Sequence, residues 1–352
     1  MSYPHDTVAL AVRGHLTAKL KEPGAYVLVD GQFGSTGKGL AASVIAMAAA
    51  DLFSVVQSNA GPNSGHTSYI GDEKIVLMQL PTFSVIASRM GTEVMTYLNA
   101  GAVIDVERVM AEIDDHSMKH VFIDPEAAVV GASAVEQESD LKDRVGSTGK
   151  GTGAAIAAKV MREEGAVAKQ RVELSGATGR MSPLHFGAMN TFVEVSQGYS
   201  LSLNASGMYP HCTSRDCTVG AALSDADIHP DYYRGSMMVI RTYPIRVAGN
   251  SGPGYEDQRE TSFEAIGVEP EFTTVTQKKR RVFTFSSVQF RRALMANRPS
   301  ALFVNFLNYL KSEEDVRSFV EARKHEYADV MGKKPELVLG GFGPLASDVK
   351  VL

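Results

Sequence analysis

The sequence has few of the features that mark secreted, metal-binding or membrane proteins. Its 352 residues include no tryptophan and only two cysteines, Cys212 and Cys217. Two cysteines cannot build a disulfide framework and their spacing fits no zinc motif, so we expect free thiols in a reducing compartment. The longest apolar stretch, residues 40–50, is too short to cross a bilayer and is better interpreted as a buried helix.

The charge also lacks a basic excess. The formal net charge is −5 at pH 7, whereas a dedicated nucleic-acid-binding protein is usually basic overall. The first residues include Asp6 and Arg13 without a continuous apolar core, so we expect no secretory signal. These absences predict a cytoplasmic protein with neither nucleic acid nor membrane as a partner.

The order of apolar and helix-forming segments indicates an α/β fold. Strands that alternate with helices favour a large, mostly parallel central sheet flanked by helices, with small subdomain excursions. The expected strands are residues 25–30, 52–57, 93–98, 121–125, 190–195, 237–243, 301–307 and 337–339. We expect residues 1–24 to form an N-terminal extension with a helix over 7–21, and residues 25–352 to form one domain.

The chain's most informative stretch is the glycine loop between residues 30 and 40. An apolar run ends at Asp30, the loop Gly31–Gly39 follows, and a run of helix formers begins at Leu40. A strand, a glycine loop and a helix in this order direct backbone N–H groups and a helix dipole at an anion. The loop is not a Walker A motif, because Gln32 and Gly39 replace a required glycine and hydroxyl. We interpret it as a nucleotide phosphate site; a glycine-rich turn without a ligand is the alternative.

Two further loops suggest a site for more than one phosphorylated molecule. The loop 58–67 follows an expected strand and contains His66, which could be a general acid or a phosphate contact, or simply solvated. The hexapeptide 146–151 repeats residues 34–39 letter for letter. A basic run at 278–281 could clamp a small dianion, or could be a solvated or nucleic-acid-binding segment.

Several motifs together resemble the adenylosuccinate synthetase family, in order, from about residue 25 onward. The matching segments are 31–40, 61–67, 146–154, 194–198, 209–213, 275–281 and 291–293. Each motif alone is weak, but seven in the same order are specific. The resemblance implies a large, mainly parallel sheet, a homodimer, and a ligase. In that family the γ-phosphoryl group of a nucleoside triphosphate is transferred to a purine C6 oxygen, and the amine of aspartate then displaces phosphate.

The resemblance also implies roles for individual residues. Ser35, Lys38, His66 and Gln197 occupy the catalytic positions, and Ser35 and the Gly65 carbonyl those that contact Mg²⁺. The triphosphate site would include Gly34, Thr36, Gly37, Lys38, Gly39, Gly65, His66, Thr67, Asn305, Asn308, Gly343 and Pro344. The purine monophosphate site would include Ser35, Asn63, Ser147, Thr148, Gln197, Thr213, Arg246 and, reaching from the partner subunit, Arg162. The aspartate site would include Thr276, Gln277, Lys278 and Arg280.

Three departures from the family pattern point to a diverged branch. Ser35 stands where the family has an aspartate that takes the purine N1 proton, which leaves room for a 2-amino group. Lys278 replaces an arginine that contacts the ribose 2′-OH, which suits a deoxyribonucleotide. Asn308 replaces the carboxylate that reads guanine in GTP, which favours ATP or dATP.

These changes agree with the phage branch of the family, which makes N6-succino-2-amino-2′-deoxyadenylate from dGMP and L-aspartate for diaminopurine genomes. A phage-encoded chain would act in the cytoplasm of its host. The alternatives are an ordinary adenylosuccinate synthetase that uses IMP and GTP, and a non-catalytic purine-nucleotide-binding protein. A kinase of another kind fits less well because the Walker A hydroxyl is missing.

Overall fold

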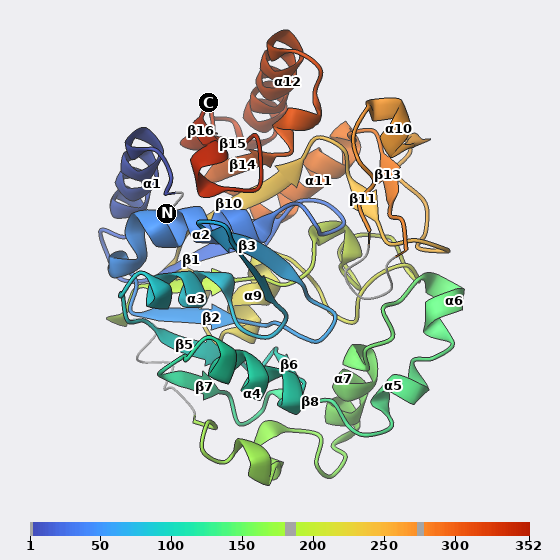
Figure 1. Cartoon of the computed structure of the whole chain (residues 1–352). Helices are drawn as coiled ribbons and strands as arrows, with labels where there is room; N and C mark the ends of the chain where they lie inside the picture. Colours follow the sequence, from blue (N-terminus) through green and yellow to red (C-terminus); the bar gives the residue numbers. More distant parts are fainter. Residues whose placement is uncertain (1–2, 180–187, 273–277) are drawn as a thin grey trace.

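The central element is a parallel sheet that runs through the molecule (Figure 1). The computed structural model describes residues 3–179, 188–272 and 278–352, and within them the main sheet has nine strands in the order β16-β15-β14-β10-β1-β9-β2-β5-β7. Its neighbouring strands pair in parallel, except that β15 and β16 are antiparallel. In chain order the strands are β1 (Ala25–Asp30), β2 (Val55–Ser58), β5 (Met95–Leu98), β7 (Val121–Ile123), β9 (Thr191–Glu194), β10 (Tyr233–Arg241), β14 (Ala301–Asn305), β15 (Leu337–Gly341) and β16 (Val349–Val351). The predicted fold class is confirmed.

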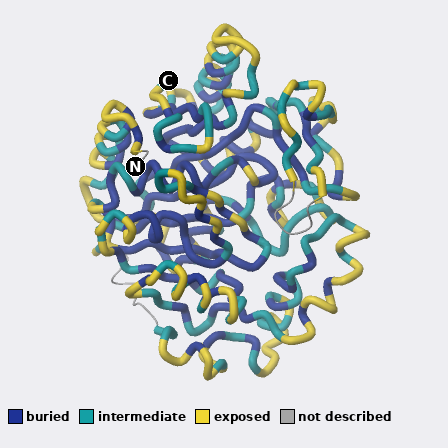
Figure 2. The backbone as a smooth tube through the Cα atoms, in the orientation of Figure 1, coloured by how far each residue is buried: buried dark blue, intermediate teal, exposed yellow. Residues whose placement is uncertain are grey.

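Helices cover both faces of this sheet, because the buried strands are apolar on both sides. In β1, Tyr26 and Leu28 face one core, whereas Val27 and Val29 face the other. The first core is covered by α1 (Asp6–Lys19), α2 (Lys38–Ala49), α3 (Thr82–Arg89) and α4 (Val106–Asp115). The second is covered by α9 (Val219–Asp225), α11 (Ser287–Asn297) and α12 (Glu313–Met331). The inner strands of the sheet are accordingly buried (Figure 2), whereas the edge strand β16 is partly exposed.

Smaller excursions surround the carboxyl edge of the sheet. The additional strands are β3 (His66–Ile70) with β4 (Glu73–Leu77), β6 (Val103–Ile104) with β8 (Ala128–Val129), and β11 (Ile245–Arg246) with β13 (Arg281–Phe283) and β12 (Glu260–Thr261). The additional helices are α5 (Ala134–Gln137), α6 (Leu141–Val145), α7 (Thr152–Met161) and α10 (Phe263–Ile266). The predicted excursions are therefore present, although the hairpin β3–β4 was not expected from the sequence.

The N-terminal helix α1 packs on the first core. Val8, Val12 and Leu16 are spaced four residues apart and are buried, as expected of an amphipathic helix. Arg13 pairs with Asp51 at 2.6 Å.

Asp51 belongs to the 3-10 turn Ala50–Leu52, which includes the first residue of the strand expected over 52–57. That strand begins only at Val55. Across residues 3–179, 188–272 and 278–352, no helix is both long and apolar enough to cross a membrane.

The order of strands places a ligand site beside β1. This strand lies in the middle of the sheet between β10 and β9, and all three run in the same direction. Loops that leave the carboxyl ends of such strands diverge to either side and open a crevice. The segments after β1, β2, β9, β10 and β14 meet there.

Candidate active site

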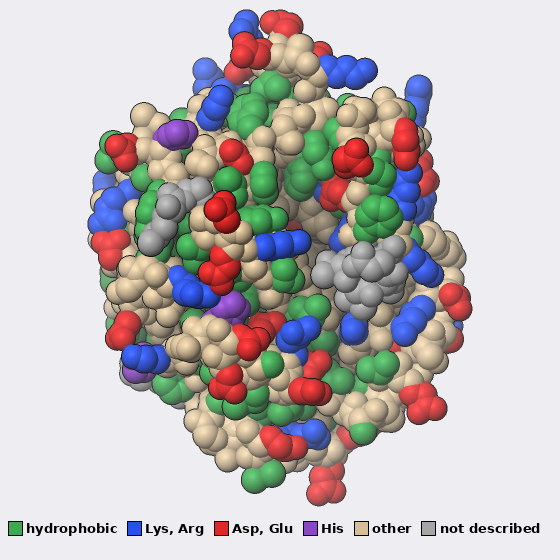
Figure 3. Space-filling model, viewed as in Figure 1, with side chains coloured by type: hydrophobic (Ala, Val, Ile, Leu, Met, Phe, Trp, Pro, Cys, Tyr) green, Lys and Arg blue, Asp and Glu red, His purple; other side chains and the backbone are tan. Residues whose placement is uncertain are grey.

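A cavity of about 1270 Å³ lies at this edge of the sheet. The surface is hollowed in the middle of the face shown in Figure 3, and Lys and Arg side chains lie around the hollow. The predicted residues that line the cavity are Gly34, Ser35, Thr36, Gly37, Lys38, Gly39, Asn63, Gly65, His66, Thr67, Ser147, Thr148, Gln197, Thr213, Arg246, Arg280, Asn305, Asn308, Gly343 and Pro344. Of the other predicted residues, Arg162 and Lys278 lie outside the lining, and Thr276 and Gln277 lie outside the described residues.

The glycine loop leads directly into α2, as the sequence predicts. Gly34, Ser35 and Gly37 have φ values of 83°, 53° and 88°, in the left-handed region that favours glycine. A side chain at Gly37 would lie 2.0 Å from Nδ2 of Asn305, and one at Gly39 would lie 2.3 Å from the carbonyl of Thr67. Because Gly37 is the N-cap of α2, no side chain there takes the free N–H groups of the first turn. The loop therefore offers backbone donors to a phosphate.

A buried carboxylate that the motif analysis missed supports this loop from beneath. Asp30 accepts hydrogen bonds from Oγ1 of Thr36 at 2.5 Å, from Nζ of Lys38 at 3.1 Å and from the backbone N–H of Gln32 at 2.8 Å. Nζ of Lys38 also donates to the carbonyl of Gln197 at 2.9 Å. The side chains of Lys38 and Asp30 are 4% and 0% exposed, so the ammonium group is fixed between two partners at the cavity wall.

His66 is oriented by a second buried carboxylate. It is the first residue of β3 instead of a loop residue, and its Nδ1 lies 2.9 Å from Oε1 of Glu194 at the end of β9. Glu194 also accepts the backbone N–H groups of Thr82 and Phe83 at the start of α3, each at 3.1 Å. Burial acts to raise the pKa of Glu194, but His66 and the two N–H groups outweigh it and hold this pKa below its usual value. With Nδ1 engaged, Nε2 is the ring nitrogen left for a ligand.

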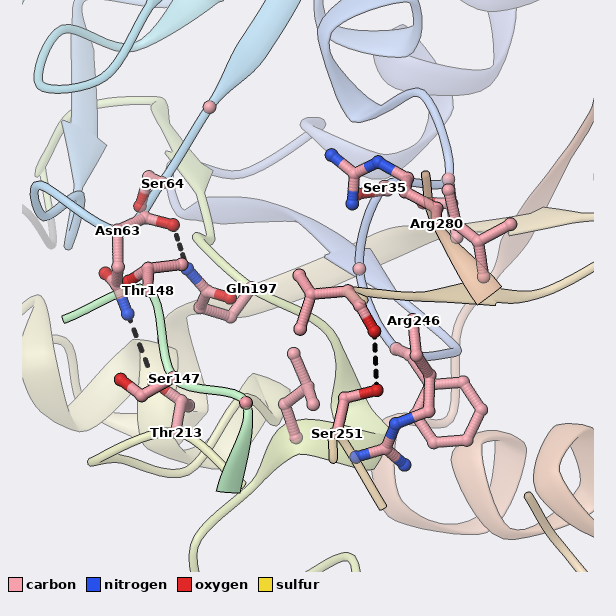
Figure 4. Close-up of a pocket in the computed structure, with 18 of the residues that line it drawn as sticks. Ser35, Asn63, Ser64, Ser147, Thr148, Gln197, Thr213, Arg246, Ser251 and Arg280 are labelled. Carbon is pink, nitrogen blue, oxygen red and sulfur yellow. Dashed lines mark hydrogen bonds between the residues drawn. The ribbon is translucent and has the colours of Figure 1, made fainter. Parts of the chain in front are cut away.

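Polar side chains from three segments meet on the side of the cavity expected to hold the purine nucleotide (Figure 4). Nε2 of Gln197 donates to the carbonyl of Asn63 at 3.0 Å, and Nδ2 of Asn63 donates to Oγ1 of Thr213 at 3.4 Å. Ser35 is exposed to the cavity across from them. Arg246 is buried, with its guanidinium 4.3 Å from the centroid of the Phe33 ring, and burial lowers its pKa to about 10.

The second glycine loop differs from the first despite its identical letters. Glu138, which follows α5, is buried and accepts hydrogen bonds from the N–H groups of Gly151, Gly153 and Ala154 at 2.8, 2.5 and 3.1 Å. These groups form the first turn of α7, so the chain's own carboxylate already occupies this helix N-terminus. The loop instead brings Ser147 and Thr148 to the cavity (Figure 4).

At the other end of the cavity, Asn305 is buried and structural. Its Nδ2 donates to the carbonyl of Thr36 at 3.1 Å, while its Oδ1 accepts the N–H of Phe306 at 3.0 Å. Asn308, in contrast, is exposed at the cavity. Arg280 also lines the cavity, close to Ser35 in the view of Figure 4, and burial lowers its pKa.

Three charged side chains that support the site share one sequence signal. Asp30, Glu194 and Arg241 each end a buried apolar strand, at the edge of the sheet where ligands bind. A charge at such a position has to be paired or functional, because burying it alone is very unfavourable. Glu138 lies in a polar helical stretch and gives no comparable signal.

The sequence and the structure both match known proteins. The family model described as adenylosuccinate synthetase matches residues 27–176 and 181–333. The N6-succino-2-amino-2′-deoxyadenylate synthase of Vibrio phage phiVC8 is 35% identical over 344 residues, covering 92% of this chain and 97% of that protein. The synthase of the same name from Salmonella phage PMBT28 is 35% identical over 361 residues, covering 92% of this chain and 96% of that one.

A solved structure agrees with these relatives. The cyanophage S-2L succinoaminodeoxyadenylate synthetase (PurZ), bound to dGMP and dATP as an energy donor, superposes with a TM-score of 0.80 and 30% sequence identity. The match covers 94% of this chain and 95% of that chain. With the glycine loop, the His66 segment and Gln197 around one cavity, the chain belongs to the adenylosuccinate synthetase family.

Proposed function

We propose that this protein is a ligase that joins L-aspartate to C6 of dGMP with hydrolysis of ATP or dATP, giving N6-succino-2-amino-2′-deoxyadenylate. The observation that carries the proposal is Ser35, which lies at the cavity where the family has an aspartate. Its short, uncharged side chain leaves space beside the purine for the 2-amino group of guanine, and its hydroxyl can accept a hydrogen bond from that group. The phage relatives and the cyanophage structure support the same substrate and product.

The segment after β14 supports an adenine nucleotide as the phosphoryl donor. A carboxylate can accept both the N1 and N2 protons of guanine, but the amide of Asn308 cannot accept that pair. Asn305 holds the carbonyl of Thr36 and is not free to read a base. Loss of the guanine-reading carboxylate argues against GTP, and therefore against an ordinary adenylosuccinate synthetase.

The fixed charges of the cavity suit phosphoryl transfer to O6 of the purine. The N–H groups of the first turn of α2, together with Lys38, hold the triphosphate, and Nε2 of His66 stabilises the phosphoryl group as it moves. The amine of aspartate then attacks C6, its proton is lost, and phosphate leaves with the oxygen that was O6. Gln197 orients the purine while Asn63, Ser147, Thr148 and Thr213 hold its 5′-phosphate.

The residues present fit Mg²⁺ that is held mainly by the substrates' phosphates. Among the described residues no cluster of three potential metal-ligating side chains occurs, and Asp30 is already occupied by Thr36, Lys38 and Gln32. Mg²⁺ usually takes few protein ligands beside phosphate oxygens and water, so the hydroxyl of Ser35 and the carbonyl of Gly65 suffice. When bound, the ion neutralises charge on the transferred phosphoryl group.

Aspartate is expected beside Arg280. This guanidinium lines the cavity near Ser35, and a planar fork of donors matches a carboxylate. Lys278 precedes it, where the family has an arginine that contacts the ribose 2′-OH. We infer from this replacement that a deoxyribonucleotide is accepted.

The deciding experiment is the mass of the product formed from aspartate and Mg²⁺ with each combination of dGMP, GMP or IMP and ATP, dATP or GTP. We expect a succino-adduct of dGMP with ATP or dATP. Product only from IMP with GTP would make the protein an ordinary adenylosuccinate synthetase, and no product from any pair would leave a nucleotide-binding protein.

Substitution of Ser35 tests the proposed basis of specificity. Ser35→Asp should lower kcat/KM for dGMP about tenfold or more, because overpacking a filled site costs about 1–3 kcal/mol. Aspartate tolerates the left-handed conformation at this position, so the loss cannot be assigned to the backbone. Ser35→Gly keeps both the conformation and the space but loses the hydroxyl, so kcat/KM for dGMP should fall less than in Ser35→Asp. Unchanged dGMP turnover by Ser35→Asp would show that Ser35 does not set the substrate.

A further inference from the structure

Arg241 is a fully buried cation at the end of the apolar strand β10, beneath the cavity. Its Nη1 donates to the backbone carbonyl of Ser35 at 2.9 Å. The guanidinium also forms a two-pronged ion pair with Glu271, in which Nη1 lies 3.2 Å from Oε2. Its flat face lies 3.7 Å from the centroid of the Phe306 ring.

The backbone from which this guanidinium extends is itself fixed. The side-chain amide of Gln32 exchanges two hydrogen bonds with the backbone of Arg241, at 2.9 and 3.1 Å. Burial acts to raise the pKa of Glu271, but Arg241 together with Tyr309 and Arg280 outweighs it and keeps this pKa below its usual value. The carboxylate of Glu271 therefore stays charged. Gln32 holds the Arg241 side of the ion pair, and Tyr309 holds the Glu271 side.

Each partner of Arg241 belongs to a different wall of the cavity. Ser35 lies in the purine-facing turn of the glycine loop. Glu271 connects to the expected aspartate-binding arm, because its carbonyl accepts the backbone N–H of Arg280 at 2.8 Å. Phe306 precedes the 3-10 turn η6 (Leu307–Tyr309) at the donor end, and the hydroxyl of Tyr309 donates to Glu271 at 3.1 Å.

We propose that Arg241 is a positioning residue that sets the conformation of the Ser35 turn and ties it to the segments expected to hold aspartate and the phosphoryl donor. Ser35 is not glycine and adopts φ 53°, so its peptide needs an external contact to hold that conformation. The planar fork of arginine donates to the carbonyl and to both carboxylate oxygens from two nitrogens, whereas an ammonium group would have to reach all three from one nitrogen. The assignment of the three walls rests on the proposed function.

The competing explanation is a buried ion pair that only stabilises the fold. The chain offers a matched control in Arg323, which is also buried, pairs with Glu326 at 2.8 Å and lies 4.3 Å from the centroid of the Phe285 ring. Arg323 and Glu326 are on α12 and are not part of the cavity lining among the described residues. If Arg241 had only a structural role, replacing either arginine would lower the melting temperature and leave KM unchanged.

The test compares Arg241→Met, Arg241→Lys and Arg323→Met below their melting temperatures. We expect Arg241→Met to raise KM for dGMP about tenfold or more, because the Ser35 carbonyl loses a charged donor. Arg241→Lys should raise it as well, because a single ammonium nitrogen replaces the fork that joins the carbonyl to both carboxylate oxygens. KM for aspartate should rise as well in Arg241→Met, while Arg323→Met should lower only the melting temperature. Wild-type KM values in Arg241→Lys would overturn the proposal, since the planar fork would then be dispensable.

Backbone hydrogen exchange provides a readout that does not depend on the reaction. In the free protein, the peptide that spans residues 31–40 should exchange faster in Arg241→Met and Arg241→Lys than in the wild type, and at the wild-type rate in Arg323→Met. Unchanged exchange in both Arg241 variants would overturn the proposal even if activity fell. If the wild type makes no succino-product, the proposed function fails, while the exchange rates still decide whether Arg241 positions the loop.

Discussion

At the scale of single residues, the site depends on carboxylates that do not line the cavity. Glu194 fixes His66 through Nδ1 and leaves Nε2 for the phosphoryl group. In Glu194→Gln the amide can present either an acceptor or a donor to the ring, so the required tautomer is no longer enforced. We expect kcat to fall by about 10²-fold, in the range of a lost acid–base contribution. KM for the phosphoryl donor should change little.

Glu112 provides the control for this substitution. Like Glu194 it is a buried carboxylate that accepts backbone N–H groups, here from Met78, Gln79 and Leu80, but among the described residues no hydrogen bond joins its carboxylate to a histidine. Glu112→Gln should therefore lose stability without the loss of kcat. Equal kinetic losses in the two variants would show that the effect of Glu194 comes from folding alone.

The contribution of Glu194 to stability should decrease as the pH falls. Because the pKa of Glu194 in the folded protein is below its usual value of 4.5, its charge stabilises the fold fully above that value. Protonation at lower pH removes this contribution. The difference in unfolding free energy between wild type and Glu194→Gln, about 3–5 kcal/mol near neutrality for a broken buried pair, should shrink below pH 4.5. Denaturant titrations across this range measure it.

At the scale of elements, two identical hexapeptides have different environments. The first turn of α2 faces the cavity, whereas that of α7 is occupied by Glu138. We expect the 5′-phosphate to be held by the loop that Glu138 supports, through Ser147 and Thr148. Glu138→Ala should therefore weaken dGMP binding, raising its KM about tenfold, and cost about 1–2 kcal/mol of stability for the lost cap. Steady-state kinetics and thermal denaturation test this.

A fall in the KM for dGMP in Glu138→Ala, instead of a rise, would identify a different phosphate site. If the N–H groups of Gly151 and Gly153 bind the phosphate themselves, Glu138 competes with it, and Glu138→Ala should tighten dGMP binding. Glu136, on the exposed side of α5, is the control and should leave KM unchanged when replaced by alanine.

The elements could be predicted from the sequence where the signal is local. The strand β1, the glycine loop and α2 follow one another directly in the chain, so composition and spacing were sufficient to predict them. The hairpin β3–β4 was missed because His66 and Thr67 continue a polar loop without an apolar run. The contact of Arg241 with Ser35 joins residues 206 positions apart, and no local pattern predicts such a pairing.

At the scale of the whole molecule, Arg162 suggests that one chain does not complete the site. This residue ends α7 in a left-handed conformation with φ 61°, is exposed, and does not line its own chain's cavity. Val160 and Met161 beside it are 66% and 71% exposed, so this end of α7 presents apolar surface next to Arg162. We propose that the protein is a homodimer in which Arg162 reaches the purine nucleotide bound by the partner.

Mixing inactive variants tests this arrangement. Arg162→Ala and Lys38→Ala should each have little activity alone, because each spoils both sites of its own dimer. In a heterodimer of the two, one site carries both substitutions and the other carries neither. Random reassociation of equal amounts should then restore about a quarter of the wild-type activity, since about half of the dimers are mixed and each has one intact site. Lys38→Ala mixed with His66→Ala is the control, because both residues belong to one chain's cavity and no intact site can form. Failure of the Arg162 mixture to recover, with dimers confirmed by sedimentation, would place Arg162 outside the partner's site.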